Sequence, residues 1–71
     1  MLQWGYVSSL EGNAARVIVP ERDDYVTAPL LIAPAALLRY DGTAGALNPG
    51  DSVTFVEFEG THGIILARLE V

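Results

Sequence analysis

The last third of this 71-residue sequence is apolar on more faces than a single buried sheet surface requires. The stretch 50–67 reads as two strands joined by a tight turn. A strand with one buried face alternates apolar and polar residues. In the first strand, Val53 and Phe55 share one face by parity, whereas Val56 and Phe58 fall on the other. A bulge near residues 56–57 would reset this alternation.

The second of these strands has the same property, and no turn residue accounts for it. Ile64 and Leu66 lie on one parity, while the opposite parity is occupied by Ile65, Ala67, Leu69 and Val71. We therefore expect Ile64 and Leu66 to point outward, onto a surface that another protein covers. This pattern favours a component of an assembly over a free-standing enzyme.

The length and composition predict one domain, residues 1–71, with a small core. A chain this short buries only about 60% of its unfolded surface, so its stability depends on additional contacts. The sequence has no cysteine and a single histidine, His62, which excludes disulfides and argues against a metal site. Because 51% of the residues are hydrophobic and only 18% are charged, partner proteins are the expected source of those contacts.

The charge balance argues against nucleic acid and membrane partners. Nine carboxylates against four arginines give a formal net charge of −5, which phosphate backbones repel. The N-terminus lacks the basic and apolar regions of a signal peptide, and the run 26–38 is too short to span a bilayer. We expect a protein that is made in the cytoplasm and has no stable membrane association.

Three strands are expected in the first half of the chain. Residues 2–10 and 14–19 contain β-favouring side chains and are separated by Glu11-Gly12-Asn13, whose turn chemistry predicts a hairpin. After a charged, exposed loop at 21–24, the stretch 25–32 resumes a strand pattern, with Pro29 marking an edge or a bulge.

The middle of the chain offers the one candidate helix. Pro34 suits a first helical turn in 34–40, although an extended segment fits these residues as well. A flexible loop follows at 41–48. The order of three strands, a short helical turn and two more strands predicts an all-β, five-stranded OB-like barrel, with an SH3-like barrel as the competing fold.

Several motifs in register resemble the OB domains of phage tail spikes and baseplate hubs. The similarity covers most of the chain, from Gly5 to about Leu69. It is formed by Gly5-x-Val7, Ala15-Arg16-Val17-x-Val19-Pro20-x-Arg22-Asp23, Thr27-x-Pro29-Leu30-Leu31, Gly50-Asp51-x-Val53-x-Phe55 and Gly60-x-x-Gly63-Ile64-Ile65-Leu66.

This resemblance implies a structural protein of a virion tail tip or of a phage-derived contractile injection system, assembled in the host cytoplasm. Such domains form homo-oligomers, most often trimers, around the tube axis and join the hub to the spike and to other baseplate proteins. They use no cofactor and no small-molecule substrate. The spike proteins continue into a β-helix, whereas this sequence ends at Val71, so we expect a collar, plug or adaptor rather than the piercing needle.

Two other functions compete with assembly. Trp4 and Tyr6 share a strand face and could stack on bases, so the alternative is an OB-fold module for single-stranded nucleic acid, although the scattered arginines form no basic groove. No spacing pairs His62 with a nucleophile, so we expect no enzyme activity and assign no catalytic residue. The predicted interface residues are Ile64, Leu66, Leu30, Leu31, Trp4, Phe58, Arg16 and Arg22, the two arginines as rim salt bridges to acidic neighbours.

Overall fold

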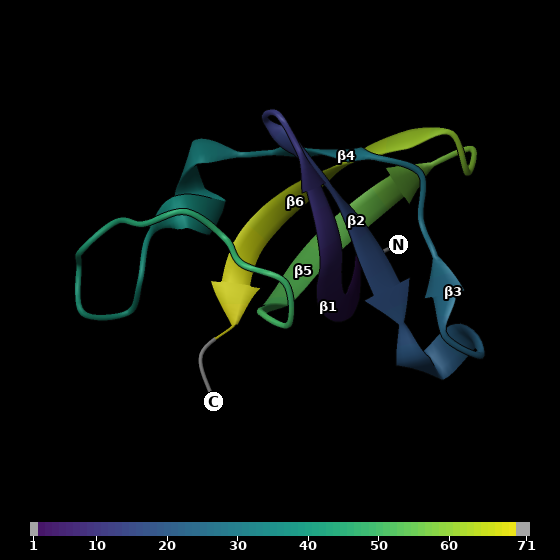
Figure 1. Cartoon of the computed structure of the whole chain (residues 1–71), viewed down its shortest axis with the longest axis horizontal. Helices are drawn as coiled ribbons and strands as arrows, with labels where there is room; N and C mark the ends of the chain where they lie inside the picture. Colours follow the sequence, from purple (N-terminus) through teal and green to yellow (C-terminus); the bar gives the residue numbers. More distant parts are fainter. Residues whose placement is uncertain (1, 70–71) are drawn as a thin grey trace.

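Six strands and two 3-10 turns make up the chain in a computed structural model that describes residues 2–69 (Figure 1). The first two strands form the predicted hairpin, which pairs residues 2–11 with residues 14–19. The strands are β1 (Leu2–Glu11), β2 (Ala14–Val19), β3 (Tyr25–Val26), β4 (Leu30–Ile32), β5 (Ser52–Phe58) and β6 (His62–Leu69), and the 3-10 turns are η1 (Pro20–Arg22) and η2 (Pro34–Leu37).

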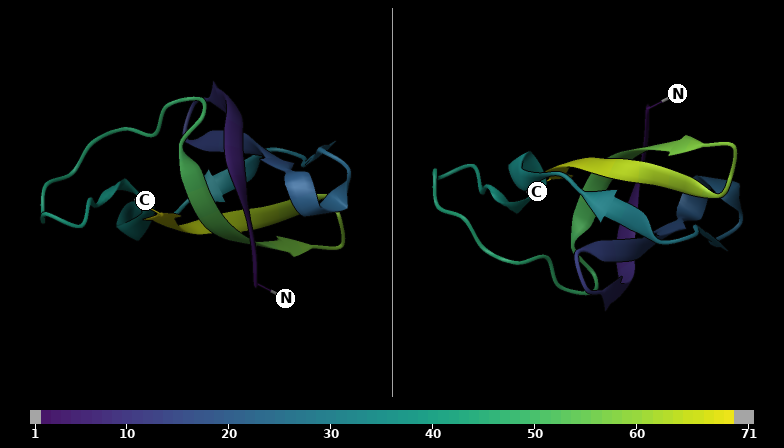
Figure 2. Two further views of the ribbon diagram at one scale, coloured as in Figure 1. Left: turned by 90° about the horizontal axis from the view of Figure 1, so that it is seen from below. Right: turned by 90° about the horizontal axis from the view of Figure 1, so that it is seen from above.

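The strands close into a barrel. Their order is β1-β5-β6-β4-β2, and β2 pairs with β1 to complete the circuit, while the short β3 adds to β2. Every pairing is antiparallel except that of β4 with β6. The two views of Figure 2 show the strands curving around one interior. The predicted all-β, five-stranded OB-like barrel is confirmed, with one extra strand.

The predicted strand 25–32 is divided into β3 and β4, which together occupy the third position of the barrel. At the break, Thr27 donates its backbone N–H to Val17 O over 2.9 Å, and its Oγ1 accepts from Val17 N over 3.1 Å. The buried hydroxyl therefore takes the place of a strand carbonyl where the chain turns toward Pro29. This substitution allows the interruption without an unsatisfied backbone group.

The predicted helix 34–40 is shorter than expected and is a 3-10 turn. η2 ends because Leu38 has extended dihedral angles and forms a β-bridge with Ala44, which draws the chain into a loop instead of a second helical turn. The loop is held by Asp41, whose carboxylate accepts from Thr43 N over 2.9 Å. The other 3-10 turn, η1, includes part of the charged segment 21–24, which was predicted to be a loop without secondary structure.

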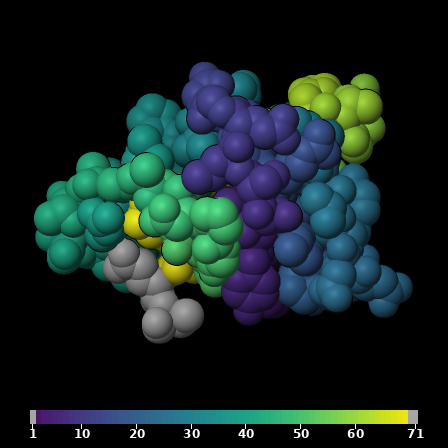
Figure 3. Space-filling model, viewed as in Figure 1, coloured from purple at the N-terminus to yellow at the C-terminus, as the bar shows by residue number. Residues whose placement is uncertain are grey.

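The core fills the barrel and is closed at one end by η2 and the segment after it. Phe55 is fully buried at the centre, and Ala36 and Leu47 contribute from outside the strands. Residues 47–51 lie beside β1 on one face of the molecule (Figure 3), where Gly50 N donates to Val7 O. The buried hydrophobic residues are Val7, Ala15, Val17, Val19, Leu30, Ala36, Leu47, Val53, Phe55 and Ile65.

Gly5 is required where β1 and β2 approach each other. A Cβ on Gly5 would lie 2.2 Å from Ile18 O, a backbone atom that cannot move without separating the two strands. The glycine therefore sets how tightly the barrel closes at this seam.

Candidate interaction surface

A β-bulge in β6 explains why its apolar residues appear on both parities. Thr54 pairs with Ala67 and Phe55 pairs with Ile65, so Leu66 has no residue opposite it. The bulge expected in the first strand near residues 56–57 is thus in the second strand, at Leu66. Because a bulge resets the alternation, Ile65 points into the core while Leu66, which is 38% exposed, and Ala67 both remain outside.

An apolar row crosses the outside of four neighbouring strands. Leu2 pairs with Val56, Val56 with Ile64, and Ile64 with Leu31. Paired residues share a face of the sheet, so these four side chains form a continuous line across β1, β5, β6 and β4. Leu2 and Leu31, at its two ends, are 60% and 57% exposed, while Val56 and Ile64 are half-buried between them.

Two further rows and a hairpin end extend this apolar region. Trp4 pairs with Thr54, and Tyr6 pairs with Ser52, each row continuing onto β6. Phe58 packs on His62 at the hairpin end, with ring centroids 5.6 Å apart. We call the whole region the outer wall: Leu2, Trp4, Tyr6, Leu31, Ser52, Thr54, Val56, Phe58, His62, Ile64, Leu66, Ala67 and Leu69.

The outer wall contains no carboxylate and no arginine, although the chain has a formal net charge of −5. Its one titratable group besides Tyr6 is His62, whose Nδ1 lies 3.0 Å from Thr61 Oγ1. An uncharged apolar surface can be buried against another protein without leaving a buried charge unpaired. The charged residues that border this one, Glu21 and Arg22, each have a partner within the chain.

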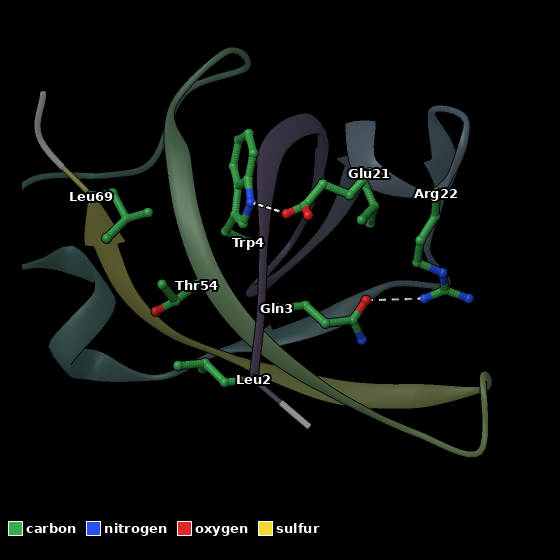
Figure 4. Close-up of a pocket in the computed structure, with 8 residues that line it drawn as sticks. Leu2, Gln3, Trp4, Glu21, Arg22, Thr54 and Leu69 are labelled. Carbon is green, nitrogen blue, oxygen red and sulfur yellow. Dashed lines mark hydrogen bonds between the residues drawn. The ribbon is translucent and has the colours of Figure 1, made fainter.

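The wall is hollowed beside Trp4 into a groove of about 550 Å³ (Figure 4). Leu2, Thr54 and Leu69 line it from the strands, and η1 closes its far side. The indole Nε1 of Trp4 donates a hydrogen bond to Glu21 in η1, as the dashed line in Figure 4 shows. This bond fixes the ring as part of the groove.

Arg22 is paired within the chain rather than left for a neighbour. Its Nη1 lies 3.0 Å from Glu57 Oε1 and 3.1 Å from Gln3 Oε1, and its guanidinium lies 4.3 Å from the ring centre of Tyr25. The Glu57 side chain is only 7% exposed and also accepts from the Tyr25 hydroxyl over 3.0 Å. This hydrogen bond to Glu57 raises the pKa of Tyr25 above its ordinary value.

The remaining predicted interface residues divide into three groups. Ile64, Leu66, Leu31, Trp4 and Phe58 all lie on the outer wall. Leu30 is fully buried, so its assignment to an interface was wrong: adjacent strand residues point to opposite sides, and Leu31 takes the outer one. Arg16 pairs with Glu11 at 2.7 Å and, like Arg22, has an acidic partner in its own chain.

Sequence reasoning missed several residues of this surface. Leu2 and Val56 were left out of the predicted interface although they complete the apolar row, and their strand pairing is the signal that identifies them. Glu57 and Tyr25 were missed because Glu57 lies 35 residues from Arg22 and 32 residues from Tyr25 in the sequence.

Neither metal chemistry nor a membrane span is indicated by the part of the chain that the structure describes. Within residues 2–69 no group of three or more potential ligands is arranged to hold a metal ion. No helix in that range has the length and hydrophobicity needed to cross a bilayer. Comparisons with protein-family models, curated proteins and solved structures find no match to this chain, so the family resemblance remains a prediction.

Proposed function

We propose that this protein is a structural component of a phage tail tip or a related injection particle, where it binds copies of itself and neighbouring tail proteins. The observation that supports the proposal is the outer wall, an uncharged apolar surface that runs across β1, β5, β6 and β4. Contiguous exposed apolar surface on a small soluble domain is typical of protein–protein contact.

Covering the outer wall would stabilise such a contact. Full burial of a leucine side chain stabilises by about 1.5–3 kcal/mol, so covering the exposed parts of Leu2 and Leu31 alone contributes roughly 2–4 kcal/mol. A specific contact buries on the order of 800 Å² on each partner. That is about a fifth of the 4230 Å² surface of the protein, and the wall spans four strands.

Nucleic-acid binding gains no support from the arrangement of the aromatic and basic residues. The rings of Trp4 and Tyr6 are 5.5 Å apart but meet at 82°, edge to face, so they do not present one flat platform to successive bases. Arg16 and Arg22 are both engaged by carboxylates of the same chain. Within residues 2–69, therefore, no positively charged groove runs along the wall.

The test is co-purification with the products of neighbouring genes, using a wall variant and a matched control. L31D places a charge in the apolar row, whereas V26D places the same charge on β3, at an aliphatic residue of comparable exposure outside the wall. We expect the wild-type protein and V26D to retain tail-tube, hub or spike proteins, and L31D to lose them. A wild-type protein that binds none of these and stays monomeric would refute the proposal.

A further inference from the structure

Arg68 is a buried arginine at the end of the barrel that η2 and the segment after it close. It follows the bulge in β6, pairs with the fully buried Val53 on β5, and is itself 8% exposed. Its Nη2 donates a hydrogen bond to the carbonyl oxygen of Gly45, while its Nε is buried and has no hydrogen-bond partner within residues 2–69. Arginine is rarely buried unless it is paired, so a partner for this side chain is expected.

A second guanidinium group lies against the same glycine. A Cβ added to Gly45 would lie 2.7 Å from Cζ of Arg39, so the Arg39 side chain occupies the space that the glycine leaves free. Nη1 of Arg39 donates to Thr43 Oγ1 over 3.3 Å. Two like charges therefore contact one residue, Arg68 at the carbonyl and Arg39 beside Cα, and they repel each other.

The acidic residues around this pair do not balance its charge. In the part of the chain that the structure describes, both ion pairs belong to the other two arginines, and neither Arg39 nor Arg68 lies within ion-pair distance of a carboxylate. Hydrogen bonds from Thr43 and, to a smaller extent, the charge of Arg39 lower the pKa of Asp41, so Asp41 is ionised at neutral pH. Two arginines and this one aspartate leave a charge of about +1 (2 − 1).

We propose that Arg39 and Arg68 bind a carboxylate group beside Gly45. Nε and Nη2 form one edge of an arginine guanidinium, and this edge matches the two oxygens of a carboxylate. In Arg68 the same edge holds the Gly45 carbonyl through Nη2 and has Nε as its remaining donor. A single negative charge balances the local excess, whereas a phosphate dianion exceeds it and is repelled more strongly by a chain with a net charge of −5.

A cleft leads to the glycine that both arginines contact. Ala44, Gly45 and Ala46 line this cleft of about 450 Å³, which lies between the β1–β2 turn and the segment after η2. Residues 45–48 belong to no strand or helix, so they can move aside for a small group without loss of strand pairing. The carboxylate can come from a free small acid or from an acidic side chain of another protein, and both present the same group to the site.

The test is a titration of the isotopically labelled protein with sodium acetate, followed by the NMR signals of the arginine Nε–H groups. Sodium chloride at the same ionic strength is the control titration. Arg16 is the internal control, because its Nε already donates to Glu11 over 2.7 Å. We expect the Arg68 Nε–H proton signal to move downfield and to saturate at acetate concentrations on the order of millimolar, as suits so small a ligand, while the Arg16 signal stays in place.

Two matched variants test the part of Arg39. R39Q removes a positive charge from the proposed site, whereas R16Q removes one from a half-exposed ion pair elsewhere, so the two proteins have the same net charge. Because the Arg39 charge attracts the bound carboxylate, R39Q should weaken acetate binding about threefold or more, and R16Q should leave it unchanged. Circular dichroism of each variant establishes that it is folded.

A short peptide with blocked ends and a single glutamate distinguishes the two sources of the carboxylate, with the corresponding glutamine peptide as its control. Binding of the glutamate peptide about tenfold tighter than acetate, and none of the glutamine peptide, assigns the site to an acidic side chain of another protein. Acetate binding as tight as that of the glutamate peptide, or tighter, assigns it to a free small acid.

Three results would overturn the inference. An Arg68 signal that does not move, or that moves equally in chloride, would leave Arg68 as a structural tie to Gly45. An Arg68 signal that has the downfield position of the Arg16 signal before acetate is added would mean that Nε has a partner in the free protein. Equal weakening of acetate binding in R39Q and R16Q would reduce the part of Arg39 to net charge. The proposed function does not depend on any of them.

Discussion

Replacing Arg22 by alanine, in the wild-type protein and in an E57Q background, measures how far the barrel depends on the ion pair at its end. R22A removes the guanidinium and leaves the Glu57 carboxylate, 7% exposed, with the Tyr25 hydroxyl as its remaining hydrogen-bond donor among those identified. E57Q keeps the shape of the side chain and removes its charge. The contacts of Arg22 with Gln3 and the Tyr25 ring are lost in both backgrounds, so they cancel in the comparison.

The expected magnitude follows from the distance and the exposure. At 3.0 Å, two unit charges attract by about 1.4 kcal/mol in water and by about 5.5 kcal/mol at an effective dielectric constant of 20. Arg22 is nearly half exposed, which moves the pair toward the lower value. We expect R22A to cost about 2 kcal/mol in the wild-type protein and about 1 kcal/mol in E57Q, a coupling energy of about 1 kcal/mol.

The assay is urea unfolding of the four proteins, followed by the fluorescence of the single Trp4 and by circular dichroism. The Arg16–Glu11 pair is the internal control, because its 2.7 Å distance is shorter but both of its side chains are nearly half exposed, whereas Glu57 is buried. Its cycle should give no more than about 0.5 kcal/mol. A coupling between Arg22 and Glu57 below about 0.3 kcal/mol, or one no larger than that of the control, would refute the reasoning.

Three further predictions concern the seam, the core and the alkaline limit of stability. G5A should cost about 3 kcal/mol because its Cβ would meet the β2 backbone, whereas G12A, at a positive φ with open space around it, should cost about 1 kcal/mol; equal losses in urea unfolding would contradict the seam argument. F55A should cost about 3–5 kcal/mol by the same measurement, and a loss under 1 kcal/mol would place Phe55 outside the core. The pKa of Tyr25 is raised in the folded protein, so its share of the stability is complete below its ordinary pKa of 10.0 and is lost as pH rises through the folded value; wild type should therefore lose stability more steeply than Y25F above about pH 10, and parallel curves would refute this.

Local signals in the sequence were sufficient for most of the strand positions. The Gly-Asn turn after Glu11, Pro20 at the end of β2 and the Gly60 turn before β6 each act within a few residues, so the strands they delimit could be predicted. The division of residues 25–32 could not be predicted, because it depends on Thr27 bonding to Val17, ten positions away in the chain.

The sequence by itself determined that β5 and β6 have more apolar residues than one buried face can accommodate, since composition and parity are properties of the chain alone. The direction of each side chain was decided by the closed barrel. Register between strands places the bulge at Leu66, sends Leu30 inward beside an exposed Leu31, and brings Arg22 to Glu57. Alternation shows that neighbouring residues differ in direction, but only the partner strands establish which side is the interior.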